Sequence, residues 1–255
     1  MAFSGQIFFD FAGYSTCAIG VALTLGFVLP ENFRYPYAAS GFSDFWRRWH
    51  ITLSAWLRDY LYIPLGGNRK GEARTYINLM ITMLLGGLWH GASWTFVVWG
   101  ALHGFYLCIE RLIKEKFRPT PEPVLADIPV QRAGIGFGRF GKRGNELLLV
   151  LLTFFCVTIT WVFFRAPDFT SAWRLLTSMF GQARDGVPIL LTLDILKVGI
   201  VVFFMLSCHW LMRNTSVLQV ARKINWWVLG IVWALLLMGV IISQKSGDSF
   251  IYFQF

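Results

Sequence analysis

The chain has 255 residues, of which 56% are hydrophobic, 17% are aromatic and only 15% are charged. Soluble domains contain about 25% charged residues, so this composition excludes an ordinary soluble protein and indicates a membrane protein. The net charge of +9 does not indicate a nucleic-acid-binding protein. The basic residues lie mainly between apolar segments, as they do in the cytoplasmic loops of membrane proteins.

The first predicted membrane span covers residues 3–29 and ends before Pro30. It lacks a basic leading region, and Asp10 interrupts its apolar stretch. We therefore interpret it as a retained span and not as a cleaved signal peptide. Residues 31–43 follow as a polar and aromatic loop.

Residues 45–67, FWRRWHITLSAWLRDYLYIPLGG, carry too many charges for a lipid-facing span. His50 lies one helical turn after Trp46, so a continuous helix would place both on one apolar face. We expect a helix that lies in the membrane interface or re-enters a protein-lined cavity, with His50 pointing inward. Arg47 and Arg48 lie off that face, where they either anchor the segment at the interface or bind an anionic donor group.

A long apolar region over residues 76–109 follows a glycine-rich turn that contains Asn68. With a rise of about 1.5 Å per residue, this region is too long for one untilted span. The stretch GGLWHGASW, residues 86–94, interrupts it. The pattern predicts two hydrophobic helices that meet at a glycine-rich break around His90.

Residues 113–144 form the main predicted linker, with four prolines, five glycines and seven Lys or Arg residues. The positive-inside rule places this loop in the cytoplasm. Three further spans are predicted at about 146–164, 188–212 and 226–243. The predicted fold class is therefore all-α, a polytopic transmembrane helical bundle with re-entrant or interfacial helices.

No metal or disulfide pattern is found in the sequence. The cysteines lie in or beside apolar runs and form no CxxC pair, so they predict neither a metal site nor a disulfide framework; they are Cys17, Cys108, Cys156 and Cys208. No ligand-spaced partner adjoins His90, which argues against a metal site there as well.

His90 is the principal candidate for catalysis. An ionisable side chain within a membrane segment is costly and is a functional candidate by default. A neutral imidazole can take a proton from a hydroxyl as a general base, and Ser93 would offer a nearby hydrogen bond. The alternative is a structural histidine that hydrogen-bonds a neighbouring helix, which is how we interpret His103 and His209.

Two long motifs carry a resemblance to a known family. The stretches ENFRYPYAASGFSDFWRRWHITLSAWLRDYLYIPLGGNR and GGLWHGASWTFVVWGALHG resemble the membrane-bound O-acyltransferases, in particular the bacterial alginate O-acetyltransferase branch. The resemblance implies a ring of tilted helices around a funnel, with residues 1–255 as one membrane-embedded domain. Family members run to several hundred residues, so we expect this chain to be the C-terminal half, without the N-terminal helices.

The resemblance also implies site residues and substrates. It makes His90, in the WHG motif, catalytic and places His50 in the same tunnel, which we expect to be shaped by Trp89, Ser93, Asn68, Arg47 and Arg48. The expected reaction transfers acetyl from a cytoplasmic thioester, such as acetyl-CoA, to a hydroxyl of an exported polysaccharide such as alginate. No bound cofactor is expected, and the location implied is the bacterial inner membrane. Periplasmic acetyltransferase proteins are the expected partners, alongside the lipid bilayer and the polysaccharide.

Two other interpretations stay open at the level of sequence. The chain could be a proton-coupled transporter or channel fragment in which His90 relays protons and the glycine break forms a binding site. It could also be an inactive truncated remnant. Proton flux without acyl transfer would favour the first, and the absence of a stable folded species in membranes would favour the second.

Overall fold

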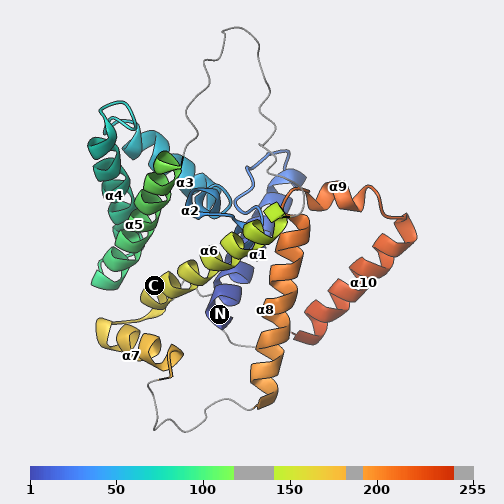
Figure 1. The fold of residues 1–255 in the computed structure, drawn as a ribbon. Helices are drawn as coiled ribbons and strands as arrows, with labels where there is room; N and C mark the ends of the chain where they lie inside the picture. The colour runs from blue at the N-terminus through green and yellow to red at the C-terminus, as the bar shows by residue number, and fades with distance from the viewer. Residues whose placement is uncertain (118–140, 182–191, 244–255) are drawn as a thin grey trace. The chain divides into compact units, whose positions relative to one another are not determined.

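The computed structural model describes residues 1–117, 141–181 and 192–243 (Figure 1). Within these ranges the regular structure is helical, without a strand, which confirms the predicted all-α class. Length and composition allow four helical segments to cross a membrane: Ala2–Thr24, Trp94–Lys116, Gly144–Arg165 and Thr192–Met212. The prediction of a polytopic helical membrane protein is confirmed.

The described residues divide into two compact units, which are considered separately. The first contains residues 1–29 and the segment from residue 190 onward. Its helices are α1 (Ala2–Thr24), α8 (Thr192–Met212), α9 (Val217–Ala221) and α10 (Trp226–Ser243). Helix α1 packs on α8, where the rings of Phe8 and His209 meet edge to face with their centroids 4.6 Å apart.

The second unit, residues 30–189, contains both sequence motifs. Its helices are η1 (Pro36–Ala38), α2 (Phe42–Trp46), α3 (Ile51–Leu57), η2 (Arg58–Tyr62), α4 (Glu72–Trp89), α5 (Trp94–Lys116), α6 (Gly141–Arg165) and α7 (Phe169–Met179). That residues 1–255 form one domain stays a prediction. Most of the predicted linker, residues 118–140, lies outside the described residues.

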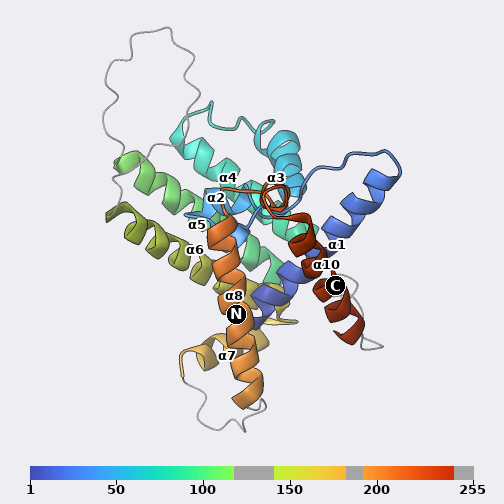
Figure 2. The ribbon, with the colours of Figure 1, turned by 90° about the vertical axis from the view of Figure 1, so that its right-hand side faces the viewer.

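Helices α4 and α5 form a closely packed hairpin, and they lie side by side in both views (Figures 1 and 2). A Cβ atom added to Gly87 would lie 2.3 Å from the carbonyl oxygen of Phe96, and one added to Gly100 would lie 2.3 Å from that of Met83. Only glycine permits such an approach of two backbones. The predicted break is confirmed, and two of its neighbouring glycines serve helix packing.

Helix α6 runs antiparallel to α5. Phe96 contacts Phe164 with ring centroids 5.1 Å apart, whereas His103, further along α5, lies 3.0 Å from the hydroxyl of Thr160. Residues further along α5 therefore contact residues earlier in α6. The end of α6 that contains Phe164 therefore lies beside the α4–α5 turn.

The expected continuous helix over the FWRRWH motif is wrong. Helix α2 ends at Trp46 and α3 begins at Ile51, with His50 between them in the left-handed conformation at φ 43° and ψ 56°. Trp46 and His50 therefore do not share one helical face. The break is held by the preceding loop, because the carbonyl oxygen of Asn32 accepts a hydrogen bond from the N–H of Ile51 at 3.0 Å.

Candidate active site

His90 lies in the turn between α4 and α5, where it ends α4. Its half-buried ring is surrounded by aromatic side chains. The ring centroids lie 5.0 Å from Trp89, 6.1 Å from Phe96, 5.2 Å from Trp99 and 5.0 Å from Phe164. Helices α4, α5 and α6 all contribute to this shell, which limits the directions from which a polar substrate can reach the imidazole.

His50 is brought close to His90 by Trp89. The Trp89 ring lies 6.2 Å from His50 and 5.0 Å from His90, measured between centroids. Trp89 is 57% exposed, so both histidines flank a ring that is open on one side. Two histidines that are 40 residues apart in sequence therefore share one centre.

Both imidazoles are neutral at physiological pH. They lie outside the four candidate spans, in turns that the surrounding rings partly bury. Burial lowers the pKa of His50 to about 4. Burial also lowers the pKa of His90 to about 4, and the proximity of His50 contributes to the decrease. A neutral imidazole is the form that can accept a proton.

Ser93 serves as the N-cap of α5. Its hydroxyl oxygen accepts a hydrogen bond from the N–H of Thr95 at 3.3 Å and lies 2.9 Å from the Thr95 hydroxyl. Such a cap satisfies a free N–H group at the helix start. The predicted tunnel role of Ser93 stays a prediction, and the contacts seen here are those of a helix cap.

The two arginines of FWRRWH have different surroundings. Arg48 pairs with Asp44 at 2.9 Å and donates to the carbonyl oxygen of Arg34 at 3.3 Å, so it ties α2 to the preceding loop. Arg47 is exposed and makes no ion pair with any residue that the structure describes. It lines a cleft at the Lys116 end of α5 together with Asn68.

This cleft has a volume of about 800 Å³ and a basic lining. Its cations are Arg47, Arg111 and Lys114; Arg111 pairs with Glu115 at 2.6 Å, and Lys114 pairs with Glu110. The described residues that line it are Ser43, Arg47, Tyr62, Asn68, Leu79, Leu107, Arg111, Ile113, Lys114, Glu115 and Phe117. Arg47 has the least compensated charge, and it suits an anionic group best.

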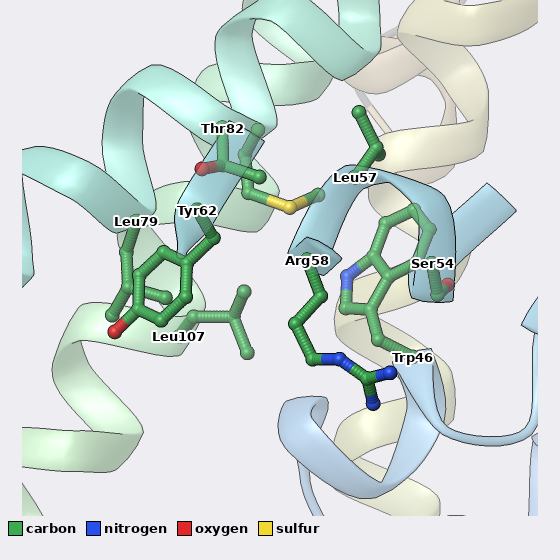
Figure 3. A pocket seen from close by; sticks show the side chains of 9 residues that line it. Trp46, Ser54, Leu57, Arg58, Tyr62, Leu79, Thr82 and Leu107 are labelled. Atoms are coloured by element: carbon green, nitrogen blue, oxygen red, sulfur yellow. The ribbon is translucent and has the colours of Figure 1, made fainter. Parts of the chain in front are cut away.

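A smaller, mainly apolar cavity of about 170 Å³ adjoins the basic cleft. Tyr62, Leu79 and Leu107 line both spaces. Figure 3 shows these three side chains on one side of the cavity and Trp46 with Ser54 on the other. The cavity lies between the α2–α3 segment and the α4–α5 hairpin.

The structure therefore separates the predicted site residues into two groups. His50, Trp89 and His90 lie together at the α4–α5 turn. Arg47 and Asn68 line the basic cleft, near the opposite end of the hairpin. His90 lies eleven positions after Leu79 of the cleft, which corresponds to about 16 Å along a helix.

Sequence reasoning did not identify Trp99, Phe164 and Asn32. Trp99 and Phe164 enclose His90, and Asn32 is hydrogen-bonded to His50 at 3.2 Å. No spacing rule connects these positions to the histidines, because three helices and a loop bring them together. The only local signal was a polar residue, Asn32, that follows Pro30 closely at the end of the first apolar run.

Comparison with known proteins places these motifs in a known family. Residues 1–124 match the sequence profile of the membrane-bound O-acyltransferases. A probable alginate O-acetylase of Azotobacter vinelandii is 46% identical over 181 residues, 71% of this chain and 32% of that protein. A peptidoglycan O-acetyltransferase of Helicobacter pylori is 34% identical, with all of this chain and 48% of that protein aligned. A teichoic acid D-alanyltransferase of Bacillus subtilis is 35% identical over 40% of this chain and 27% of that protein.

The chain thus spans less than half of the length of the acetyl-transferring relatives described above, 32% of one and 48% of the other. The match to the sequence profile includes α1 to α5, with His50, Trp89 and His90. The alignment with the peptidoglycan O-acetyltransferase extends over the whole chain.

Proposed function

Because the chain belongs to the membrane-bound O-acyltransferase family, we propose that it forms the histidine-bearing part of an O-acetyltransferase. The acetyl group comes from a cytoplasmic thioester, such as acetyl-CoA, and goes to a hydroxyl of an exported polysaccharide. Alginate and peptidoglycan are the candidate acceptors, since the relatives are named for them. Transfer is direct or passes through a periplasmic acetyltransferase partner, and the bacterial inner membrane is the proposed location.

The observation that carries this proposal is the shared centre of His50, Trp89 and His90. Two neutral imidazoles beside one partly open ring provide proton-accepting nitrogens where a hydroxyl can approach. No charged side chain is needed, because neutral imidazole is already the reactive form.

The proposed chemistry uses His90 as the general base. Its imidazole takes the proton of the acceptor hydroxyl while that oxygen attacks the thioester carbonyl. The carbon–sulfur bond then breaks, and the departing thiolate receives the proton from the imidazolium. An alternative route forms an acyl-histidine first and transfers the acyl group in a second step. The aromatic shell around His90 supports either route by keeping bulk water away.

The two adjoining spaces support a donor path from the opposite end of the hairpin. Arg47 suits the anionic part of a thioester donor, and the apolar cavity beyond it suits an uncharged arm. Met83, which lines this cavity, lies seven positions before His90, so about 10 Å of helix separates the cavity from His90 and the donor must be extended. The basic residues of the 113–144 segment support a cytoplasmic position for the cleft, by the positive-inside rule.

The test is ester-linked acetate on the exported polysaccharide of cells in which the chromosomal gene is unaltered, deleted or changed to His90→Ala. We expect the deletion and the His90→Ala cells to lose the acetate, with the variant present at the normal membrane level. Normal acetate in His90→Ala cells would show that His90 is not the base. Normal acetate after deletion would remove the proposed function itself.

A further inference from the structure

The side-chain oxygen of Asn32 is the centre of a hydrogen-bond cluster at the start of α3. It accepts from the Thr52 N–H at 3.3 Å and from the Thr52 hydroxyl at 3.0 Å, and it lies 3.2 Å from Nδ1 of His50. The main-chain oxygen of Asn32 accepts from the N–H of Ile51 at 3.0 Å. Asn32 thus accepts hydrogen bonds from the first two N–H groups of α3. The N-cap residue of this helix makes no side-chain hydrogen bond to them.

This cluster determines the tautomer of His50. A backbone N–H can only donate, so the Asn32 atom that meets Thr52 N–H is the amide oxygen. An amide oxygen can only accept, so Nδ1 of His50 must be the protonated nitrogen. In the neutral ring the other nitrogen, Nε2, then carries the lone pair.

The same cluster holds an unusual backbone conformation. His50 is one of only two non-glycine residues with positive φ in the described part of the chain. Such conformations persist where the surroundings over-determine them, and they concentrate at functional sites. Here the loop is hydrogen-bonded to both sides of the turn, through Ile51 N–H to Asn32 and through Arg34 N–H to the carbonyl of Arg48 at 2.9 Å.

His90 has no comparable anchor. Its ring contacts within the described residues are aromatic, and none is a hydrogen bond that would select a tautomer. Of the two histidines beside Trp89, His50 is therefore the one whose proton-accepting ring nitrogen, Nε2, is defined by a hydrogen bond to the other nitrogen.

We propose that Asn32 is a positioning residue, which holds His50 in its left-handed turn and keeps Nε2 as the proton-accepting nitrogen beside the Trp89–His90 centre. The catalytic consequence rests on the proposed function, whereas the tautomer itself does not. His50 then takes part in proton transfer together with His90, and Asn32 acts through His50 without touching the substrate.

The direct test is nitrogen-15 NMR of the full chain with labelled histidine, in detergent micelles. A His50→Gln variant identifies the His50 signals. We expect Nδ1 of His50 to be protonated and Nε2 to be unprotonated. We expect Asn32→Leu to give a mixture of the two tautomers. A protonated Nε2 in the unaltered protein would overturn the proposal, as would an unchanged tautomer in Asn32→Leu.

The kinetic test compares Asn32→Leu, Asn32→Asp and Thr52→Val in the acetyl-transfer assay. Thr52→Val is the matched control, because it removes one bond to the same oxygen and leaves the His50 bond. We expect Asn32→Leu to lower kcat at least tenfold with little change in KM, and Thr52→Val to stay within about threefold. Equal losses in both variants would indicate a merely structural role and overturn the proposal.

Asn32→Asp keeps the acceptor oxygen and adds a negative charge beside His50. An opposite charge at this distance raises a histidine pKa by about 1–3 units. The acid limb of the pH–rate profile should therefore move to higher pH by that amount. The other charged or titratable groups on the packed elements stay unaltered; they are Tyr35, Arg47, His90 and the pairs Arg48–Asp44, Arg34–Glu31 and Arg58–Asp59.

An acid limb that stays in place in Asn32→Asp would overturn the catalytic part of the proposal. If the unaltered protein transfers no acetyl group, the proposed function fails, and the NMR measurement still decides whether Asn32 sets the tautomer of His50. If Asn32→Leu does not fold, the tautomer in the unaltered protein and the Asn32→Asp profile still decide the proposal.

Discussion

At the scale of single residues, His90 is defined by what surrounds it. Trp99 is 1% exposed and lies between two histidines, with ring centroids 5.2 Å from His90 and 4.8 Å from His103. His103 is itself fully buried and lies 3.0 Å from the Thr160 hydroxyl. That hydroxyl donates to the Val157 carbonyl at 2.8 Å, so it accepts from His103. His103 therefore makes the contacts of a structural histidine, as predicted.

The first prediction concerns pH. Burial lowers the pKa of both His50 and His90 to about 4, so both are neutral bases across the physiological range. We expect the acetyl-transfer rate to be level from about pH 8 down to about pH 5 and to fall only below that, as imidazole becomes protonated. If the base were a histidine with an unperturbed pKa, the rate would fall to half its maximum at about pH 6.5.

The measurement is kcat/KM against pH in membrane vesicles, with the amount of folded protein checked at each pH. A midpoint near the unperturbed value would show that the base is solvated, contrary to the enclosed site described here.

At the scale of elements, the hairpin of α4 and α5 supports the centre. The approach of the two backbones at Gly87 and Gly100 fixes the turn that presents His90. We predict that Gly100→Ala destabilises the protein by about 1–3 kcal/mol, because the added Cβ atom would meet a main-chain oxygen that cannot move alone. The check is the midpoint of thermal unfolding in detergent.

Gly199→Ala in α8 is the matched control, since a Cβ atom there meets nothing within 4 Å. We expect its unfolding midpoint to equal or slightly exceed that of the unaltered protein, because alanine is the better helix former. Equal loss in both variants would show that the hairpin contact is not special.

The sequence predicted the elements better than it predicted the site. Apolar runs and glycines located the hairpin and its break, because span length and helix packing leave local marks. The first span ends at Thr24, five residues before its predicted end at 29. The helix through FWRRWH was wrong because a loop residue, Asn32, competes for the N–H groups of α3. Such a contact between distant positions has no periodicity to detect.

The candidate site shows the same division. His90 and His50 were selected individually, but their shared ring, Trp89, depends on where the α2–α3 turn packs against the end of α4. Asn68 was grouped with the histidines and lies instead beside the basic cleft, where its side chain accepts a hydrogen bond from Tyr62. The two groups occupy different ends of one hairpin, a separation that only the fold reveals.

At the scale of the whole molecule, the proposed donor path requires one orientation in the membrane. Residue 127 lies in the basic 113–144 segment, and Ser178 lies on α7, after α6, which is long and apolar enough to cross the membrane once. We predict that Asp127→Cys is labelled by an impermeant maleimide only from the cytoplasmic side and Ser178→Cys only from the opposite side. The four native cysteines are first replaced by alanine. Labelling of both positions from one side would contradict the path.

The central claim is that the His50–Trp89–His90 centre performs acyl transfer. The most direct measurement is the initial rate of acetyl-ester formation in membrane vesicles containing the unaltered protein, His90→Gln or His209→Gln at matched levels. His209 serves as the control because it is a buried histidine of the other unit. We predict a loss of at least about 100-fold for His90→Gln, as expected for a general base, and little change for His209→Gln. A His90→Gln rate within about threefold of the unaltered rate, too small a loss for a general base, would contradict the account.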